Sequence, residues 1–156
     1  MSIPHGGLLD PEHIPDRECH CDSHDKKCPI ILKNDGYTLD LGLVIIESMT
    51  KYKNMQPYCV INNLKRSKLD PNRDIQNGAQ DNAEVVQAFQ NYHNFIRKAK
   101  TRFKRGLLID LHGQHTTQVT ELGTMTNIFI ICFQNTYLAL IQGTYYLRCP
   151  ILECAF

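Results

Sequence analysis

The sequence of 156 residues lacks the features that indicate several large functional classes. Its formal net charge is only +1, so no excess of either sign indicates binding to nucleic acid or to a membrane surface. It contains no internal repeat and no low-complexity tract. Gln134 and Asn135 interrupt its most apolar text, so no run reaches the ~18 residues that a membrane-spanning helix requires. We therefore expect neither a nucleic-acid partner nor a membrane partner.

A secretory signal is also missing, because the first residues carry neither a basic segment nor an apolar one. The seven cysteines form an odd number, which does not suit a complete disulfide framework. Free thiols in a reducing compartment explain them better, so the expected localisation is cytoplasmic.

What the sequence does contain is an alternation of strand-like and helix-like patterns. The order is a strand fragment, a helix, a strand, a helix and a buried strand, at 1–3, near 38–53, at 58–62, at about 81–103 and within 105–113. This βαβαβ pattern implies parallel strands joined by right-handed crossovers. The expected fold is α/β with three layers, a mostly parallel or mixed sheet and helices on both faces. Because Met1 lies so close to His5, most of a first strand is missing and the sheet is expected to be incomplete.

The expected domain is 1–124, and a divergent apolar tail follows at 125–156. Two interpretations of the tail stay open: two short strands, or a divergent end produced by altered splicing or gene prediction. Within the domain, Asp81 and Glu84 have the spacing of a capping box at the start of the second helix, and Gly106 can close that helix. The Lys and Arg residues between 97 and 105 are interpreted as a solvated helix end, with a patch for an anionic partner as the alternative.

Three polar clusters follow the predicted strands. Asp110 and His112 stand two residues apart in the last strand, so they share one face at its carboxyl end. His5 follows the first strand, and the polar loop 63–80 follows the second. Because the carboxyl ends of parallel strands meet at one edge of a sheet, these clusters are expected to converge in one crevice.

The histidines of this crevice are candidate metal ligands. Imidazole suits zinc, and a catalytic zinc site needs three protein ligands and an open position. With His5 and His112 as two ligands, the third is expected to be Asp22 or Asp25, with Glu12 as a weaker alternative. Asp110 is expected to orient His112, since ligating imidazoles usually donate their other N–H to a carboxylate or carbonyl. The plainer alternative is a surface histidine at 5 and a core histidine at 112.

The remaining candidates concern the substrate and the proton. The guanidinium groups of Arg66 and Arg73 match a carboxylate bidentately, and Asn72 can donate to the same carboxylate or to an oxyanion. Glu121 is a candidate general base. In the plainer interpretation, Arg66 and Arg73 are solvated loop residues or form structural ion pairs, and Glu121 is a surface glutamate.

A second metal hypothesis involves the loop 19–28. It holds three thiols and two imidazoles within ten residues: Cys19, His20, Cys21, His24 and Cys28. This set suits a structural zinc, although Cys19 and Cys21 are closer in sequence than most ligand pairs. On this hypothesis the chain is a non-catalytic zinc-binding module that works through partners.

Four short motifs occur in a fixed order: Pro4-His5-Gly6-Gly7, Ile14-Pro15-x-Arg17, Leu69-Asp70-Pro71-Asn72-Arg73 and Asp110-Leu111-His112-Gly113. Together they resemble the N-formylglutamate amidohydrolase family, and the resemblance runs from Ser2 to about Thr124. The element from Asp70 to Arg73 also resembles the substrate-carboxylate motif of zinc carboxypeptidases and acyl-amino-acid deacylases.

The resemblance implies a zinc-dependent hydrolase of amide bonds in small N-acyl amino acids, with activity low or absent if the chain is truncated. His5 and His112 would bind zinc with an acidic residue of 22–25, while Asn72 and Arg73 would hold the substrate carboxylate. The sequence departs from the family at Gln114, where another histidine is common, and in the text after Thr124.

Overall fold

The computed structural model describes residues 1–18, 30–103, 106–114, 121–125, 128–134 and 152–154. In chain order the elements are β1 (Ser2–Ile3), α1 (Thr38–Lys53), β2 (Cys59–Ile61), α2 (Ile75–Ala79), α3 (Ala83–Arg102), β3 (Leu108–Gln114), β4 (Glu121–Met125), β5 (Ile128–Gln134) and β6 (Leu152–Cys154). Among the described residues, no helix is both long and apolar enough to cross a membrane.

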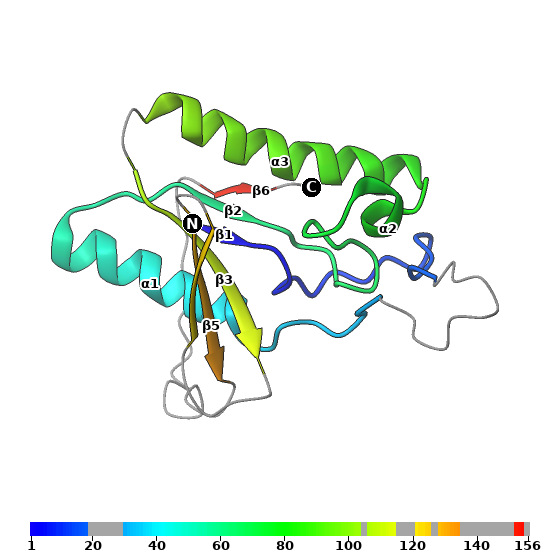
Figure 1. Ribbon diagram of the computed structural model, residues 1–156, viewed down its shortest axis with the longest axis horizontal. Coiled ribbons are helices and arrows are strands. Elements are labelled where there is room, and N and C mark those ends of the chain that lie inside the picture. The colour runs from blue at the N-terminus through cyan, green and yellow to red at the C-terminus, as the bar shows by residue number, and fades with distance from the viewer. Residues whose placement is uncertain (19–29, 104–105, 115–120, 126–127, 135–151, 155–156) are drawn as a thin grey trace.

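The strands form one sheet in the order β4-β5-β3-β1-β2-β6 (Figure 1). Only the β4–β5 pair is antiparallel. The short strand β1 lies in the middle, where Ser2 pairs with Val60 of β2 on one side and with Asp110 of β3 on the other. The predicted α/β class with a largely parallel sheet is therefore confirmed. The domain boundary expected after residue 124 falls inside β4.

The central strands bury different residues against different helices. Ile61 and Ile3 pack in one cluster with Ile46 of α1, whereas Val60 packs with Tyr92 of α3. This alternation follows from the two-residue repeat of a strand, which turns successive side chains to opposite faces. Figure 1 shows α1 and α3 on opposite sides of the strands.

The first helix begins close to where the sequence predicts it. The Asp35-Gly36 turn precedes it, and Tyr37 occupies the N-cap in the left-handed region, with φ 63°. The Thr38 hydroxyl donates to the Asp35 carbonyl at 2.8 Å, which fixes this turn. Gly42 then lets the helix approach β1, because a Cβ atom there would lie 2.2 Å from Ile3 Cδ1. This close packing of α1 on β1 places the turn at Asp35 next to the residues that follow β1.

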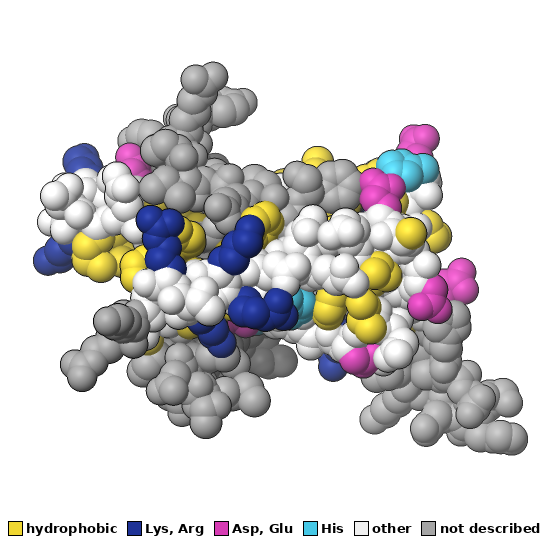
Figure 2. Space-filling model, turned by 90° about the horizontal axis from the view of Figure 1, so that it is seen from above, with side chains coloured by type: hydrophobic (Ala, Val, Ile, Leu, Met, Phe, Trp, Pro, Cys, Tyr) yellow, Lys and Arg dark blue, Asp and Glu magenta, His cyan; other side chains and the backbone are white. Residues whose placement is uncertain are grey.

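Two details of the 63–106 region differ from the sequence prediction. The N-cap of α3 is Asn82, whose side chain accepts from the Glu84 and Val85 amides, and Asp81 instead has a left-handed φ of 58°. The helix ends before Gly106, because Phe103 already has an extended backbone. Arg97 and Lys98 of α3 are exposed. Figure 2 shows several Lys and Arg side chains on the face of the molecule that it presents.

The polar loop predicted at 63–80 contains the short helix α2. Its N-cap is Asp74, which accepts from the Asn77 amide at 3.0 Å. Gly78 allows it to pack closely, since a Cβ atom there would lie 2.5 Å from the Asp70 carbonyl oxygen. The Asp70 amide in turn donates to the Gly78 carbonyl at 3.1 Å. Tertiary contacts rather than helix propensity therefore explain α2, and they fix the backbone at Asp70.

Candidate metal centre

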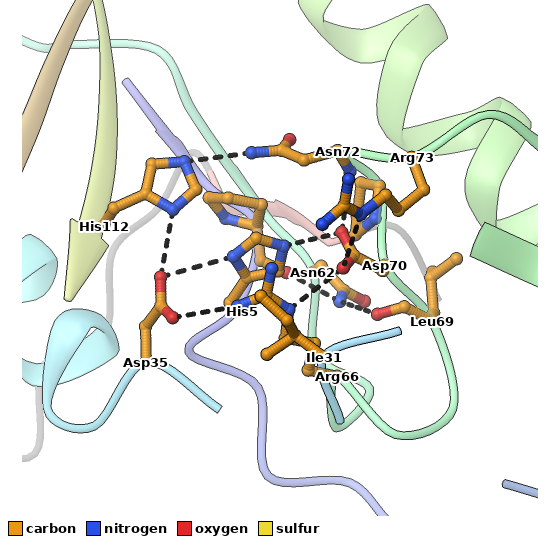
Figure 3. A network of polar contacts seen from close by, with 12 residues as sticks. His5, Ile31, Asp35, Asn62, Arg66, Leu69, Asp70, Asn72, Arg73 and His112 are labelled. Atoms are coloured by element: carbon orange, nitrogen blue, oxygen red, sulfur yellow. Dashed lines mark hydrogen bonds and ion pairs between the residues drawn. The ribbon is translucent and has the colours of Figure 1, made fainter. Parts of the chain in front are cut away.

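Two imidazoles and one carboxylate meet at the carboxyl ends of β1 and β3 (Figure 3). They belong to His5, Asp35 and His112, and one ligand atom of each lies within 4.8 Å of the other two. Asp35 Oδ2 is 3.2 Å from His5 Nδ1 and 3.0 Å from His112 Nδ1. Within the described part of the chain this is the only such group of three.

The backbone explains why these residues meet. Strands β1 and β3 are parallel neighbours with Ser2 opposite Asp110, so the residues that follow Ile3 lie at the same end of the sheet as the last residues of β3, which include His112. Asp35 is held against both: its amide donates to the His5 carbonyl at 3.1 Å, and its Oδ2 accepts from the Gly113 amide at 3.1 Å. Gly113 permits this approach, since a Cβ atom there would lie 3.2 Å from Asp35 Cβ.

Each imidazole contacts a further carboxylate through its other nitrogen. His5 Nε2 lies 2.7 Å from Asp70 Oδ1, and His112 Nε2 lies 3.1 Å from Asp110 Oδ2. A proton on each Nε2 satisfies these contacts, and both Nδ1 atoms face Asp35, to which an imidazole donates when its Nδ1 is protonated as well. Paired carboxylates on the distal nitrogens are the usual environment of metal-binding histidines.

The electrostatics of the three groups are strongly coupled. Burial acts to lower the pKa of His112, but the hydrogen bonds to Asp110 and Asp35 outweigh it and raise this pKa to about 9. Burial acts to raise the pKa of Asp35, but hydrogen bonds from His112 and His5 hold it well below its ordinary value. The imidazole of His112 lies between the carboxylates of Asp35 and Asp110, and at neutral pH it is therefore mostly protonated. The two carboxylates together attract a positive charge to this position.

Asp70 connects the centre to a buried group of guanidinium ions. Its carboxylate is fully buried and accepts from Arg66 Nε at 3.0 Å, while Arg17 Nη2 lies 3.7 Å away. Burial opposes ionisation, yet His5 and Arg66 hold the pKa of Asp70 well below its ordinary value. Arg17 itself donates to carbonyl groups of three segments, at Ile31, Arg66 and Asn77. It ties the loop before α1 to the loop after β2.

Arg66, which the sequence places at the substrate, bridges two carboxylates. Its Nη1 donates to Asp35 Oδ1 at 3.2 Å and its Nε to Asp70, and only 11% of its side chain is exposed. Arg66 thus binds the Asp35 oxygen that faces away from the imidazoles. This geometry points to a structural use of its guanidinium group.

Asn72 and Arg73 lie at the rim of the centre. Asn72 Nδ2 is 2.9 Å from His112 Nε2. Arg73 Nε is 4.0 Å from Asp70 Oδ2, and 42% of its side chain is exposed. Of the basic residues named around Asp70, Arg73 is the one most accessible to a ligand.

Other candidates from the sequence are not brought to the centre by any described contact. Asp22, Asp25 and the cysteine-rich loop 19–28 lie outside the described residues. Glu121 begins β4, and both it and His112 pair with Cys132 of β5. One strand therefore separates their backbones, which corresponds to roughly 10 Å.

Asp35 is the residue that sequence reasoning missed. The Asp35-Gly36 dipeptide indicates a turn, and nothing in it distinguishes a metal-binding aspartate from a turn-forming one. Comparison with family models, curated proteins and solved structures found no match for this chain. The geometry of the site is therefore what indicates a function.

Proposed function

We propose that the chain is a zinc-dependent hydrolase of amide bonds in small N-acyl amino acids, like members of the N-formylglutamate amidohydrolase family, built on a three-layer α/β fold. His5, Asp35 and His112 hold the metal. The observation that carries the proposal is the arrangement of two Nδ1 atoms around one carboxylate oxygen, with each distal nitrogen on its own carboxylate.

The donor set fits zinc in number and type, and the two distances from Asp35 fit a tetrahedral site. Two imidazoles and a carboxylate are a common catalytic zinc set that keeps a position open. At metal–ligand distances near 2.0–2.1 Å, donor atoms of a tetrahedral site lie roughly 3.3 Å apart. The distances from Asp35 Oδ2 to the two Nδ1 atoms, 3.2 and 3.0 Å, agree with that spacing. A zinc ion held in this way supplies polarisation of a carbonyl group and a water of pKa near 7.

The surrounding residues prepare the ligands. Asp70 and Asp110 accept hydrogen bonds from protonated Nε2 atoms, which would leave each Nδ1 lone pair for the metal. Arg66 occupies Asp35 Oδ1 and so leaves Oδ2 as the coordinating oxygen. Three buried or partly buried aspartates meet the guanidinium ions of Arg17 and Arg66 here, so one negative charge remains and offsets part of the charge of a divalent metal ion.

Asn72 and Arg73 are the proposed substrate residues. When His112 Nε2 carries a proton that it donates to Asp110, it cannot accept from Asn72, so the Asn72 amide is available to a ligand. The Arg73 fork matches a carboxylate, and its 4.0 Å approach to Asp70 is too long to hold it firmly. An N-acyl amino acid presents its carboxylate here and its amide toward the metal. Glu121 is the proposed proton shuttle to the leaving amine.

The test combines metal content and hydrolysis. We expect one zinc per chain in the wild type, its loss in the double variant His5→Ala/His112→Ala, and its retention in Cys21→Ser. We further expect the wild type to release formate from N-formylglutamate or another N-formyl amino acid. Zinc retained in the double variant and lost in Cys21→Ser would overturn the proposal and favour a zinc-binding module built on the loop 19–28.

A further inference from the structure

The hydroxyl group of Ser2 extends the metal centre into the core of the sheet. Ser2 is buried in β1 and stands opposite Asp110 in the β1–β3 pair. Its Oγ donates to Asp110 Oδ1 at 2.7 Å, while the other oxygen of Asp110 contacts His112 Nε2 at 3.1 Å. A hydroxyl, a carboxylate and an imidazole therefore follow one another from the core to the metal ligand.

Ser2 has two acceptors within reach and makes the better bond to the carboxylate. Its Oγ is 3.4 Å from the Ile109 carbonyl oxygen, at the outer limit of a hydrogen bond, and 2.7 Å from Asp110. Hydrogen bonds to an ionised acceptor are shorter and stronger than those to a neutral one. The preference for Asp110 indicates that Ser2 orients the carboxylate rather than only satisfying the strand backbone.

Asp110 depends on such a partner. The carboxylate is largely buried, and its two oxygens have one contact each, Oδ1 with Ser2 and Oδ2 with His112. Without the Ser2 hydroxyl, one carboxylate oxygen would lose its hydrogen-bond donor, and the side chain would be free to rotate away from His112.

Tyr92 approaches the same pair from α3. Its hydroxyl is fully buried and makes no hydrogen bond with any described residue. Burial raises the pKa of Tyr92 well above its ordinary value, and the charge of Asp110 raises it further. The phenol is thus a second buried hydroxyl near the Asp110 charge, but it has no hydrogen-bond partner in the described part of the chain. Its removal is therefore a control for the removal of the Ser2 hydroxyl.

We propose that Ser2 is a positioning residue of the metal centre, which fixes Asp110 so that Asp110 holds His112 with Nδ1 turned toward Asp35. This inference rests on the proposed metal site and adds to it a residue that touches no ligand atom. It predicts that Ser2 affects metal binding only through Asp110.

A double-mutant cycle tests this dependence. Zinc dissociation constants of the full chain would be measured by competition with a chromophoric chelator for the wild type, Ser2→Ala, Asp110→Ala and the double variant. Loss of a residue that supports a metal ligand typically weakens binding about 10–100-fold. We expect Ser2→Ala to weaken zinc binding about 10-fold in the wild-type background and less than about 2-fold in the Asp110→Ala background.

Controls separate positioning from general destabilisation. Tyr92→Phe removes a neighbouring buried hydroxyl that is not bonded to Asp110, and Thr50→Ala removes a hydroxyl that donates only to the Ile46 carbonyl. Both should leave zinc affinity unchanged. With cobalt as probe, Ser2→Ala should alter the visible absorption of the bound ion, and Ser2→Thr should restore both spectrum and affinity.

The outcomes are distinct. A wild type that binds no zinc contradicts the proposed function itself. Zinc binding in the wild type with an unchanged dissociation constant in Ser2→Ala leaves that function in place and overturns the role of Ser2. Equal losses from Ser2→Ala in both backgrounds also overturn it, because Ser2 would then act independently of Asp110.

Discussion

The two histidines of the candidate centre have the same kind of partners and very different surroundings. His5 is buried, and its distal nitrogen meets Asp70, which is itself enclosed by Arg17 and Arg66. His112 is partly exposed, and its distal nitrogen meets Asp110 and the exposed side chain of Asn72. The difference indicates a division between a structural half around His5 and an accessible half around His112. We therefore expect changes around His5 to affect mainly folding, and changes around His112 to affect mainly the proposed binding of metal and substrate.

Asp70→Ala should have the largest effect on stability. It leaves His5 Nε2 and two guanidinium groups without their buried carboxylate, and breaking a buried ion pair typically costs about 3–5 kcal/mol. Urea unfolding of the metal-free protein measures this cost. The matched change in the other half, Asp110→Ala, should cost only about 1–2 kcal/mol, because its surroundings are partly open to water. Equal losses would contradict the division.

Arg17→Lys should have the next largest effect. Lysine cannot reproduce the fork that donates to the carbonyls of Ile31, Arg66 and Asn77, so buried acceptors are left unpaired. Each such group costs about 1–3 kcal/mol, and we expect a loss of about 2–3 kcal/mol in urea unfolding. Arg73→Lys, at the exposed rim, should unfold at the wild-type urea concentration. A destabilised Arg73→Lys would show that the rim also belongs to the scaffold.

Arg73→Ala should change substrate binding and little else. A hydrogen bond to a charged group is worth about 1.5–3 kcal/mol, so KM for an N-formyl amino acid should rise about 10–100-fold. We expect kcat, zinc content and unfolding to change little, because Arg73 is exposed and only loosely paired. Arg97→Ala, which removes an exposed arginine of α3, is the control and should leave KM unchanged. An unaltered KM in Arg73→Ala would remove this residue from the substrate site.

His13→Ala should have the smallest effect and gives the surface reference for both halves. His13 Nε2 is 2.9 Å from Glu84 Oε2, a distance similar to those at His5 and His112, but both partners are exposed. Exposed ion pairs contribute about 0–1 kcal/mol, so unfolding should shift by less than about 0.5 kcal/mol. A loss comparable to that of Asp70→Ala would mean that burial does not govern these histidine–carboxylate pairs.

The elements of the fold could be predicted well where apolar periodicity is strong. The helices α1 and α3 lie within a few residues of their predicted positions, since each buries residues at helical spacing. The strand β3 also forms where the sequence predicts it, but among residues 108–113 only Leu111 is fully buried. The short helix α2 could not be predicted, because five residues with an internal Gly78 have no helical periodicity. The choice of Asn82 over Asp81 as cap depends on backbone angles that the pattern Asp81–Glu84 does not encode.

The candidate site could be predicted in part. Strand ends place His5, Asp110 and His112 at one edge, because parallel strands make that geometry general. The position of Asp35 depends on how the loop before α1 returns to Gly113, which is a tertiary contact. The hydrogen bonds from Arg66 to Asp35 and Asp70 are also tertiary contacts, so they could not be predicted. The sequence alone does not distinguish Arg66 from Arg73.

The most direct test of the central claim compares two aspartates. Zinc content of the purified full chain would be measured by mass spectrometry after dialysis, for the wild type, Asp35→Ala and the double variant Asp22→Ala/Asp25→Ala. The account predicts one zinc in the wild type and in the double variant, and little or none in Asp35→Ala. Zinc retained by Asp35→Ala and lost from the double variant would contradict it, and would assign the third ligand to the loop 19–28.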